Sequence, residues 1–555
     1  MLRLVFVLFR NVLNIFSYVL LLPFFVLKRR FFRPDEQWVR IRLSGALPIV
    51  GPAGLGRWFQ NAPTFLQMRR NIKAIADSKD IDTVLIDIRD PGMGPSVQRE
   101  VKSWIGNIRD SGKRVIAYSD SFSTSTYALA STATEIVMPP SGRLYTFRPR
   151  SEQIFANKLL TRLGILPQFL HIGAFKTASH RFIRSEGTTA QRGMTDELLD
   201  GMSRLTTEHI QESRGLNADE VARLFEAPVD AGLAKHRNFI HGEGFATDFP
   251  EHPDHRDYLD SVLKLEVLPF RRPAVIALVD LTGFIVTPDM QVPTNGPVID
   301  SGVVVPLLER LAKNPRIRGV ILHIDSPGGS ALASDLIWHS VANLTQEKPV
   351  VAWCTNVVAS GGYYIAVGAN AIVCTPESIV GSIGVIAGKF AVRGLAEHAD
   401  VRVEVHGDDS TSMMSLVDPL AGKGLATLTE DTRRFYTRFL ERVGMARNIA
   451  PRRLHRYARG RVYLGEPALS RNLVDGIGGF EEAVARIHAL CELSEDKTVF
   501  RTFGHRSPSL KAAIRSSILG RVVAQGMSAV EDDAVVATLL KHQEVLALMP
   551  QSYRW

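Results

Sequence analysis

Hydrophobic and polar residues alternate along the chain in the pattern of α/β proteins. In two long stretches, residues 40–250 and 272–490, short apolar runs are interleaved with amphipathic runs of helical period. The short apolar runs predict buried strands, and the amphipathic runs predict helices that pack against them. The expected fold class is therefore α/β, in two large units.

The two stretches resemble one another, which indicates an internal duplication. Residues 84–92 match residues 320–328 at an offset of 236 (328 − 92), and the same offset carries residues 127–130 onto 363–366. A third match, around Asn238, changes the offset by two. Any two α/β units share strand, Pro-Gly and helix signals, but three matches in one order at a nearly constant offset favour duplication.

The first candidate for chemistry lies between Pro349 and Gly384. Val350–Cys354 is a short, partly β-branched run that predicts a buried strand, and Ser360 follows it, just before a helical run. The next residues are two glycines. They leave the backbone bare beside the hydroxyl, and the helix that they open would point free N–H groups toward an oxyanion formed there. Two interpretations are open: a serine nucleophile, or an ordinary helix N-cap followed by turn glycines.

The first stretch lacks this arrangement. At the offset of 236, Ser360 and its two glycines fall on Thr124, Ser125 and Thr126. Thr124 is β-branched and has no glycines beside it, so it is poorly placed to act as a nucleophile. We expect the nucleophile in the second stretch alone.

A serine nucleophile needs a group that takes its proton, usually histidine and more rarely a lysine made neutral by burial. No histidine near Ser360 lies in a recognisable base motif, and the chain has no Gly-x-Ser-x-Gly elbow. Lys176 stands among small and apolar residues in the run 172–179. Burial would lower its pKa from the reference near 10.4, as a general base requires. The alternative is a surface lysine beside a strand, and the equivalent position in the second stretch is Ser412.

Four segments together resemble the signal peptide peptidase A family, also called protease IV, in its large duplicated form. They are Asp325–Ser330, Ala359–Tyr363, Gly381–Gly384 and Gly173–Ala178. The likeness covers roughly residues 45–490. It implies two tandem crotonase-like, caseinolytic-protease-like (ClpP-like) ββα-rich domains after an N-terminal membrane helix, although the Pro-Gly-Gly turn by itself is shared with other folds of this type.

The resemblance implies a Ser/Lys dyad divided between the halves, with Ser360 as nucleophile and Lys176 as base. It also implies that backbone N–H groups of Gly328 or Gly329 form the oxyanion hole and that Ser382 hydrogen-bonds the lysine. Glycine lets backbone donors approach an oxyanion closely. The plain alternatives are a tight strand-to-helix turn for the glycines and a satisfied turn hydroxyl for the serine.

The function implied by the resemblance is a membrane-bound serine endopeptidase that cleaves hydrophobic peptides such as residual signal peptides. It also implies a ring-like homo-oligomer, with a tetramer as one candidate. No metal or nucleotide is expected, because the chain has no Walker or dinucleotide fingerprint. Three alternatives remain: a catalytically silent membrane scaffold, a crotonase-like acyl-CoA enzyme, and a peptidase with Lys389 as its base, since small relatives carry both dyad members in one domain.

Residues 1–33 predict a membrane anchor with a basic flank, because Met1–Phe32 is strongly apolar and no small-residue cleavage site follows. The clean apolar core, Ile15–Leu27, is shorter than the roughly 20 residues of a spanning helix, so a helix lying in the interface is an alternative. The basic residues after the segment favour a cytoplasmic body. The resemblance implies instead a body on the periplasmic side of the inner membrane.

Composition adds only exclusions. Apolar residues make up 45% and charged residues 22%, as in globular proteins. The net charge of +9 comes without any nucleic-acid-binding signature, so we expect no nucleic acid partner. The three scattered cysteines imply neither a disulfide framework nor a metal cluster. Residues 494–555 carry helical patterns around 510–523 and 530–548, and they predict a helical tail for packing or subunit contact.

Overall fold

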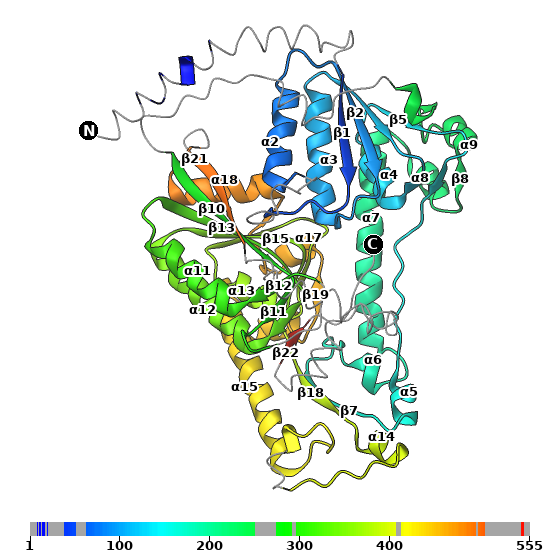
Figure 1. Ribbon diagram of the computed structural model, residues 1–555. Coiled ribbons are helices and arrows are strands. Elements are labelled where there is room, and N and C mark those ends of the chain that lie inside the picture. The colour runs from blue at the N-terminus through cyan, green and yellow to red at the C-terminus, as the bar shows by residue number, and fades with distance from the viewer. Residues whose placement is uncertain are drawn as a thin grey trace.

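The computed structural model describes residues 38–51, 63–249, 273–290, 296–406, 412–494, 498–504 and 546–548, with scattered positions between 8 and 19. These residues form a mixed α/β fold, as the sequence predicts (Figure 1).

The first half of the chain builds a five-stranded parallel sheet in the order β1-β2-β3-β5-β9. Its strands are Trp38–Ser44, Thr83–Arg89, Arg114–Tyr118, Glu135–Met138 and Gly242–Glu243. A small sheet beside it joins β4 (Phe122–Ser123), β6 (Arg143–Tyr145) and β8 (Val229–Asp230). The helices of this half are α2 (Phe65–Ala76), α3 (Pro95–Asp110), α4 (Thr124–Ala130), α5 (Asn157–Arg162), α6 (His180–Ile183), α7 (Thr189–Arg214), α8 (Ala218–Leu224) and α9 (Ala231–His236).

The second half builds an eight-stranded sheet in the order β19-β17-β15-β13-β10-β21, with β16 beside β15 and β20 beside β16. Its strands are β10 (Ala274–Thr282), β13 (Ile317–Ser326), β15 (Val350–Ala359), β16 (Ala371–Cys374), β17 (Ile379–Gly381), β19 (Val462–Tyr463), β20 (Gly476–Ile477) and β21 (Thr498–Phe503). The helices are α11 (Ser301–Lys313), α12 (Ala331–Glu347), α13 (Gly361–Ala366), α14 (Arg393–His398), α15 (Gly422–Arg447), α16 (Pro451–Tyr457), α17 (Gly465–Leu469) and α18 (Phe480–Cys491).

A third sheet joins the two halves in the order β12-β11-β14-β22-β18-β7. Its strands are β12 (Val298–Asp300), β11 (Phe284–Val286), β14 (Gly328–Ser330), β22 (Leu546–Leu548), β18 (Val385–Ala391) and β7 (Leu166–Ile172). The first half supplies β7, which pairs antiparallel with β18 of the second half along seven residues (Figure 1). This pairing holds the loop after β7 against the second half.

The halves also share a hydrophobic core. Phe65 of α2 lies with its ring centroid 5.0 Å from Trp104 of α3, 5.1 Å from Trp353 of β15 and 5.4 Å from Phe480 of α18. The four rings come from both halves and are almost fully buried. Burial of large aromatic side chains is a major source of folding free energy, so this cluster fixes how the halves meet.

Helix α7 of the first half reaches the end of the second-half sheet, as Figure 1 shows. Its buried face, which includes Met194, Leu198 and Met202, packs on Ala359 and Val462. The last residue of β15 is therefore held by apolar contacts from the other half of the chain.

The expected membrane anchor, residues 1–33, lies almost entirely outside the described residues. Among the helices that the structure describes, none is both long and apolar enough to cross a bilayer.

The prediction of a helical tail over 494–555 is wrong for the parts that the structure describes. Residues 498–503 form β21, a strand parallel to β10, and residues 546–548 form β22, between β14 and β18. An apolar run as short as Leu546–Leu548 fits either a helix or a strand. Here the backbone groups of two neighbouring strands decide in favour of a strand.

Candidate active site

Ser360 lies on a strained turn between β15 and α13. Its backbone has φ 56° and ψ −115°, a conformation that costs a non-glycine residue about 1–3 kcal/mol. The glycines after it are required by space: a Cβ on Gly361 would lie 2.4 Å from Ser334 Oγ, and one on Gly362 would lie 2.8 Å from the Ser326 carbonyl oxygen. Ser360 occupies the N-cap position, but its hydroxyl makes no capping bond, so the side chain is free for another partner.

That partner is Lys176. Its Nζ lies 2.6 Å from Ser360 Oγ, 3.0 Å from Ser382 Oγ and 3.0 Å from the Ser382 carbonyl oxygen. All three side chains are fully buried. Burial lowers the pKa of Lys176 well below its ordinary value, because the charged ammonium loses its hydration. Lys176 is not the surface lysine of the alternative interpretation, and its neutral form has a lone pair that can accept the hydroxyl proton.

A loop that sequence reasoning missed holds these groups together. We call residues 459–461, between α16 and β19, the clamp loop. Its first carbonyl accepts a hydrogen bond from the Phe175 N–H (2.9 Å), its middle N–H donates to the Ile383 carbonyl (2.8 Å), and its last carbonyl accepts from the Ser382 N–H (2.8 Å). The clamp loop therefore connects the loop of the first half that carries Lys176 to the loop of the second half that carries Ser382.

Gly460, in the middle of the clamp loop, packs directly on Lys176. A Cβ at Gly460 would lie 2.4 Å from the Lys176 backbone nitrogen, and the residue has φ +82°. Gly173 fits as closely, since its Cβ would lie 2.3 Å from the Arg459 carbonyl carbon. In the sequence, the only signal for this contact is a glycine within a basic run.

The glycine turn of β14 lies beside the nucleophile. A Cβ on Gly361 would lie 3.4 Å from Gly328 Cα, and a Cβ on Gly329 would lie 2.1 Å from the Ile285 carbonyl oxygen of β11. The Gly328 N–H donates to Ser326 Oγ at 3.2 Å. The turn is therefore close to the serine, as expected for oxyanion donors, while the role itself stays a prediction.

Lys389, the rival base, is also buried, but it has other partners. Its Nζ donates to the carbonyl oxygens of Ser412 and Ser415. Within the described part of the chain, no group of three or more His, Cys, Asp or Glu side chains is placed to hold a metal ion.

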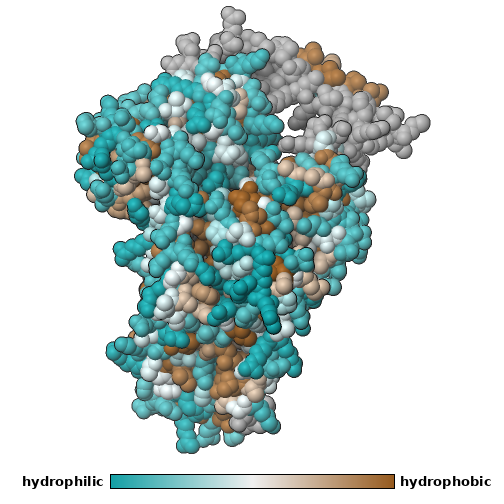
Figure 2. Space-filling view, turned by 180° about the vertical axis from the view of Figure 1, so that it is seen from behind, coloured by the Kyte–Doolittle hydropathy of each residue, from teal (hydrophilic) through white to brown (hydrophobic). Residues whose placement is uncertain are grey.

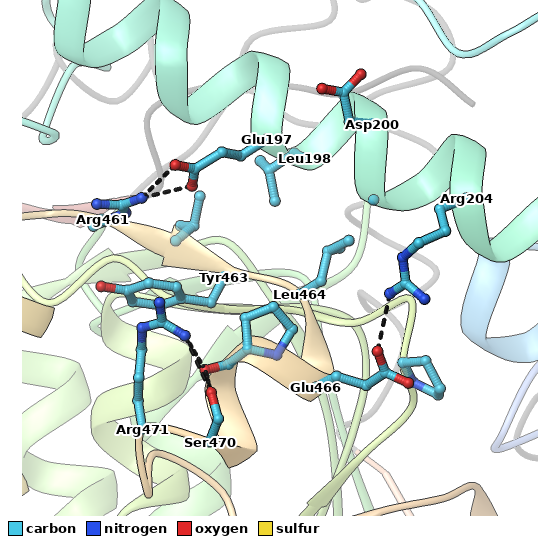
Figure 3. Close-up of a pocket in the computed structure, with 14 residues that line it drawn as sticks. Glu197, Leu198, Asp200, Arg204, Arg461, Tyr463, Leu464, Glu466, Ser470 and Arg471 are labelled. Carbon is cyan, nitrogen blue, oxygen red and sulfur yellow. Dashed lines mark hydrogen bonds and ion pairs between the residues drawn. The ribbon is translucent and has the colours of Figure 1, made fainter.

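A surface pocket of about 600 Å³ lies between α7 and the β19–α17 segment. Figure 3 shows Glu197 of α7 pointing to Arg461, which it holds by an ion pair at 2.6 Å, and Arg204 paired with Glu466 at 2.9 Å. The pocket contains neither Ser360 nor Lys176. It adjoins the site through Arg461, whose guanidinium also lies 5.1 Å from the Phe175 ring.

A buried serine on a strained strand-to-helix turn, in contact with a buried amine within a mixed α/β fold, is an arrangement expected of a serine-type hydrolase. A family model described as Peptidase family S49 matches residues 107–237 and 342–494, together about half of the chain. The chain belongs to peptidase family S49 and is a serine-type peptidase.

Proteins with similar sequences are named as proteases. The chain is 25% identical over 514 residues to "Serine protease SPPA, chloroplastic" of Arabidopsis thaliana, covering 87% of this chain and 75% of that protein. It is 28% identical over 423 residues to "Protease 4" of Haemophilus influenzae, covering 71% of this chain and 68% of that protein. A solved membrane-bound stomatin-specific protease has 14% identity and a TM-score of 0.27, covering 45% of this chain and 99% of that one.

Proposed function

We propose that this serine peptidase works through a Ser/Lys dyad, with Ser360 as nucleophile and Lys176 as general base. The observation that carries the proposal is the 2.6 Å contact between Lys176 Nζ and Ser360 Oγ in a fully buried setting. Desolvation favours the neutral form of the amine over the charged one, and a neutral amine at hydrogen-bond distance can accept the hydroxyl proton.

The reaction then follows acyl-enzyme chemistry. Ser360 Oγ attacks the peptide carbonyl carbon while Lys176 takes its proton, and backbone N–H groups of Gly328 or Gly329 stabilise the oxyanion. Lys176 passes the proton to the leaving nitrogen. Water then hydrolyses the Ser360 ester with the same amine as base. Ser382 positions the amine through its two oxygen contacts at 3.0 Å.

The proposal includes two tandem crotonase-like domains, 40–250 with Lys176 and 272–490 with Ser360, after an anchor at 1–33. The sheets support it, because the parallel order β1-β2-β3-β5-β9 is repeated as β10-β13-β15-β16-β20 in the second half. In both halves the described helix after the third of these strands, α4 or α13, contains one of the matched segments, 127–130 or 363–366.

We further propose hydrophobic peptides, including residual signal peptides, as substrates, and membrane attachment with a homo-oligomeric ring. An exposed apolar patch supports association. It comprises Leu159, Leu163, Leu166 and Leu395, of which the side chains are 39–56% exposed. Apolar residues also gather on the lower part of the face in Figure 2. Contiguous apolar surface of this kind is typical of protein or membrane contacts.

A serine-reactive fluorophosphonate probe tests the dyad. We expect labelling of the full chain to disappear in Ser360→Ala and in Lys176→Ala, while Lys389→Met, a substitution at the rival buried lysine, keeps it. Thermal unfolding of each variant confirms that it is folded. Labelling that survives Lys176→Ala would point to another base, and a folded wild-type chain without labelling or peptide cleavage would favour the silent scaffold.

A further inference from the structure

Two ion pairs cross the contact between α7 of the first half and residues 461–471 of the second, which we call the seam. They lie on opposite sides of the surface pocket (Figure 3). Glu197 holds Arg461 at 2.6 Å, and Arg204 holds Glu466 at 2.9 Å. All four side chains are 25–60% exposed. Exposed ion pairs add little to stability, so neither pair is expected to decide whether the halves stay together.

The Arg461 guanidinium lies between two aromatic rings, 5.1 Å from Phe175 and 5.5 Å from Tyr463. Arg471 also lies over Tyr463, at 4.6 Å, so two like charges share one ring. Among the described residues, Arg461 Nε is buried and has no hydrogen-bond partner, a cost that a move of the side chain into solvent would remove. The Glu197 carboxylate is therefore the group that keeps the guanidinium over Phe175.

Phe175 connects this guanidinium to the proposed dyad. It precedes Lys176, and its half-buried ring packs against an apolar cluster of α7, β15 and β19 that includes Ala359. Ala359 in turn precedes Ser360. The ring thus lies next to both chain segments that bring amine and hydroxyl together. Because burial lowers the pKa of Lys176, a ring that moved away would admit water to the amine and favour its charged form.

We propose that the ion pair between Glu197 and Arg461 positions the base of this peptidase, because it holds the guanidinium over Phe175 and so keeps Lys176 shielded from water and aligned with Ser360. Among the described contacts, neither side chain of the pair hydrogen-bonds Ser360 or Lys176, so both are positioning residues. The inference rests on the proposed function for the roles of Lys176 and Ser360. The position of the loop that carries Phe175 does not depend on those roles.

The test compares Glu197→Gln with Glu466→Gln, which breaks the other ion pair of the seam. Both substitutions keep the size of the side chain and remove one exposed charge, so both chains should unfold within about 4 °C of the wild type. We expect Glu197→Gln to lower kcat for a fluorogenic alanine-leucine peptide by about tenfold, with KM changed by less than about twofold, since a small displacement of a reacting group costs rate. Glu466→Gln should keep the kcat of the wild type.

The pH dependence of fluorophosphonate labelling at Ser360 separates positioning from a general disturbance of the fold. In Glu197→Gln, water that reaches Lys176 should raise the midpoint by about one pH unit, toward the ordinary lysine value of 10.5. In Glu466→Gln the midpoint should stay where it is in the wild type. Arg461→Lys keeps the charge but loses the planar group that stacks on the ring, so it should behave like Glu197→Gln.

Hydrogen exchange of the backbone amides of residues 173–178 reports the position of the loop without any chemistry. The Phe175 N–H donates to the Arg459 carbonyl at 2.9 Å, and we expect its exchange to be faster in Glu197→Gln than in Glu466→Gln. If exchange differs in this way but no chain is labelled, the positioning of the loop stands and the proposed dyad fails.

The opposite result is equally clear. If all chains are labelled at one rate with one midpoint, and exchange is equal, the dyad stands and the inference is overturned. Equal losses of kcat in Glu197→Gln and Glu466→Gln would also overturn it, because the effect would then belong to the seam as a whole.

Discussion

At the scale of single residues, the site combines reactivity with a cost in stability. Lys176 is fully buried, and within the described residues it contacts no carboxylate; its partners are the oxygens of Ser360 and Ser382. Burial alone lowers its pKa. The unfolded chain holds the proton up to about pH 10.5, so the unfolded state binds more protons over the window between the lowered pKa and that value. Stability therefore rises with pH across this window and falls as pH drops toward the folded pKa.

Substitutions at Lys176 should separate activity from stability. We expect Lys176→Met to lose 10³-fold or more in peptidase activity and to unfold at a higher temperature than the wild type at pH 7, because methionine needs no deprotonation to be buried. Lys176→Arg should be equally inactive and less stable, since arginine keeps its charge. Activity assays and thermal unfolding at pH 7 check this. If Lys176→Met is less stable than the wild type, the hydrogen bonds of Lys176 contribute more to stability than the burial of its amine costs.

The pH dependence of labelling at Ser360 reports the same amine. Protonated Lys176 cannot accept the hydroxyl proton, so the rate should rise with pH as the amine loses its proton. Its midpoint should lie well below 10.5, the ordinary value of a lysine pKa. Labelling rates from pH 5 to 10 measure it. A midpoint near 10.5 would contradict a buried, neutral base.

At the scale of elements, the clamp loop sets the distance between the proposed base and the proposed nucleophile. It makes three backbone bonds to the loops that carry Lys176 and Ser382, and none of them needs a particular side chain. Two close glycine contacts, at Gly460 and Gly173, are what allow the approach. The geometry of the dyad is thus decided by backbone packing between loops far apart in the sequence.

Gly460→Ala should displace Lys176. The added Cβ meets the Lys176 backbone at 2.4 Å, and a shift on the order of 1 Å in a reacting group can cost about 10²-fold in rate. The matched control is Gly112→Ala, because Gly112 has φ +87° but no atom within 4 Å of the new Cβ. Both variants carry similar backbone strain, so only Gly460→Ala should lose activity by about 10²-fold. Equal losses of peptidase activity in the two variants would assign the effect to strain.

A second contact between elements contains a carboxyl group that titrates near neutral pH. Glu100 of α3 accepts a hydrogen bond from the Phe480 N–H, at the start of α18 in the other half. Burial raises the pKa of Glu100 to about 7, against the bond from Phe480 and the neighbouring Arg69, while Glu481 adds to the rise. The folded state keeps a proton that the unfolded chain releases near pH 4.5, so stability falls as pH rises from about 4.5 to about 7.

Glu100→Gln should remove this loss of stability with rising pH, since glutamine keeps the hydrogen-bond acceptor and carries no charge. We expect the variant to be more stable than the wild type at pH 8 by up to about 3 kcal/mol and equal to it near pH 4. Urea unfolding at both values measures the difference. Glu481→Gln, on the exposed side of the same contact, is the control and should keep most of the pH dependence. A Glu100→Gln variant that is less stable than the wild type at pH 8 would mean that the carboxylate is needed as the hydrogen-bond acceptor.

At the scale of the whole molecule, one chain supplies both groups of the proposed dyad. The shared aromatic core and the β7–β18 pairing bring Lys176 of the first half to Ser360 of the second within a single chain. Chains of Ser360→Ala mixed or co-expressed with Lys176→Ala should therefore show no labelling, in any assembly. Recovery of labelling would reveal an exchange of halves between chains, in which one intact dyad is rebuilt.

The sequence by itself determined what depends on near neighbours. The strand at Val350–Cys354, the turn at Ser360 and the α/β class follow from residues within a few positions of each other, since apolar period and glycine placement act locally. The family motifs drew attention to Lys176 and Ser382, and the packing then brought both to Ser360.

Only the tertiary structure decided the rest. The burial of Lys176, the clamp loop and the position of β22 depend on contacts between residues far apart in the sequence, such as Lys176 with Ser360 and Gly328 with Leu548. Such contacts form wherever the total burial and backbone pairing are most favourable, and no local pattern encodes that balance. The short run Leu546–Leu548 fits a helix by its own period. It forms a strand because it pairs with the edges of β14 and β18.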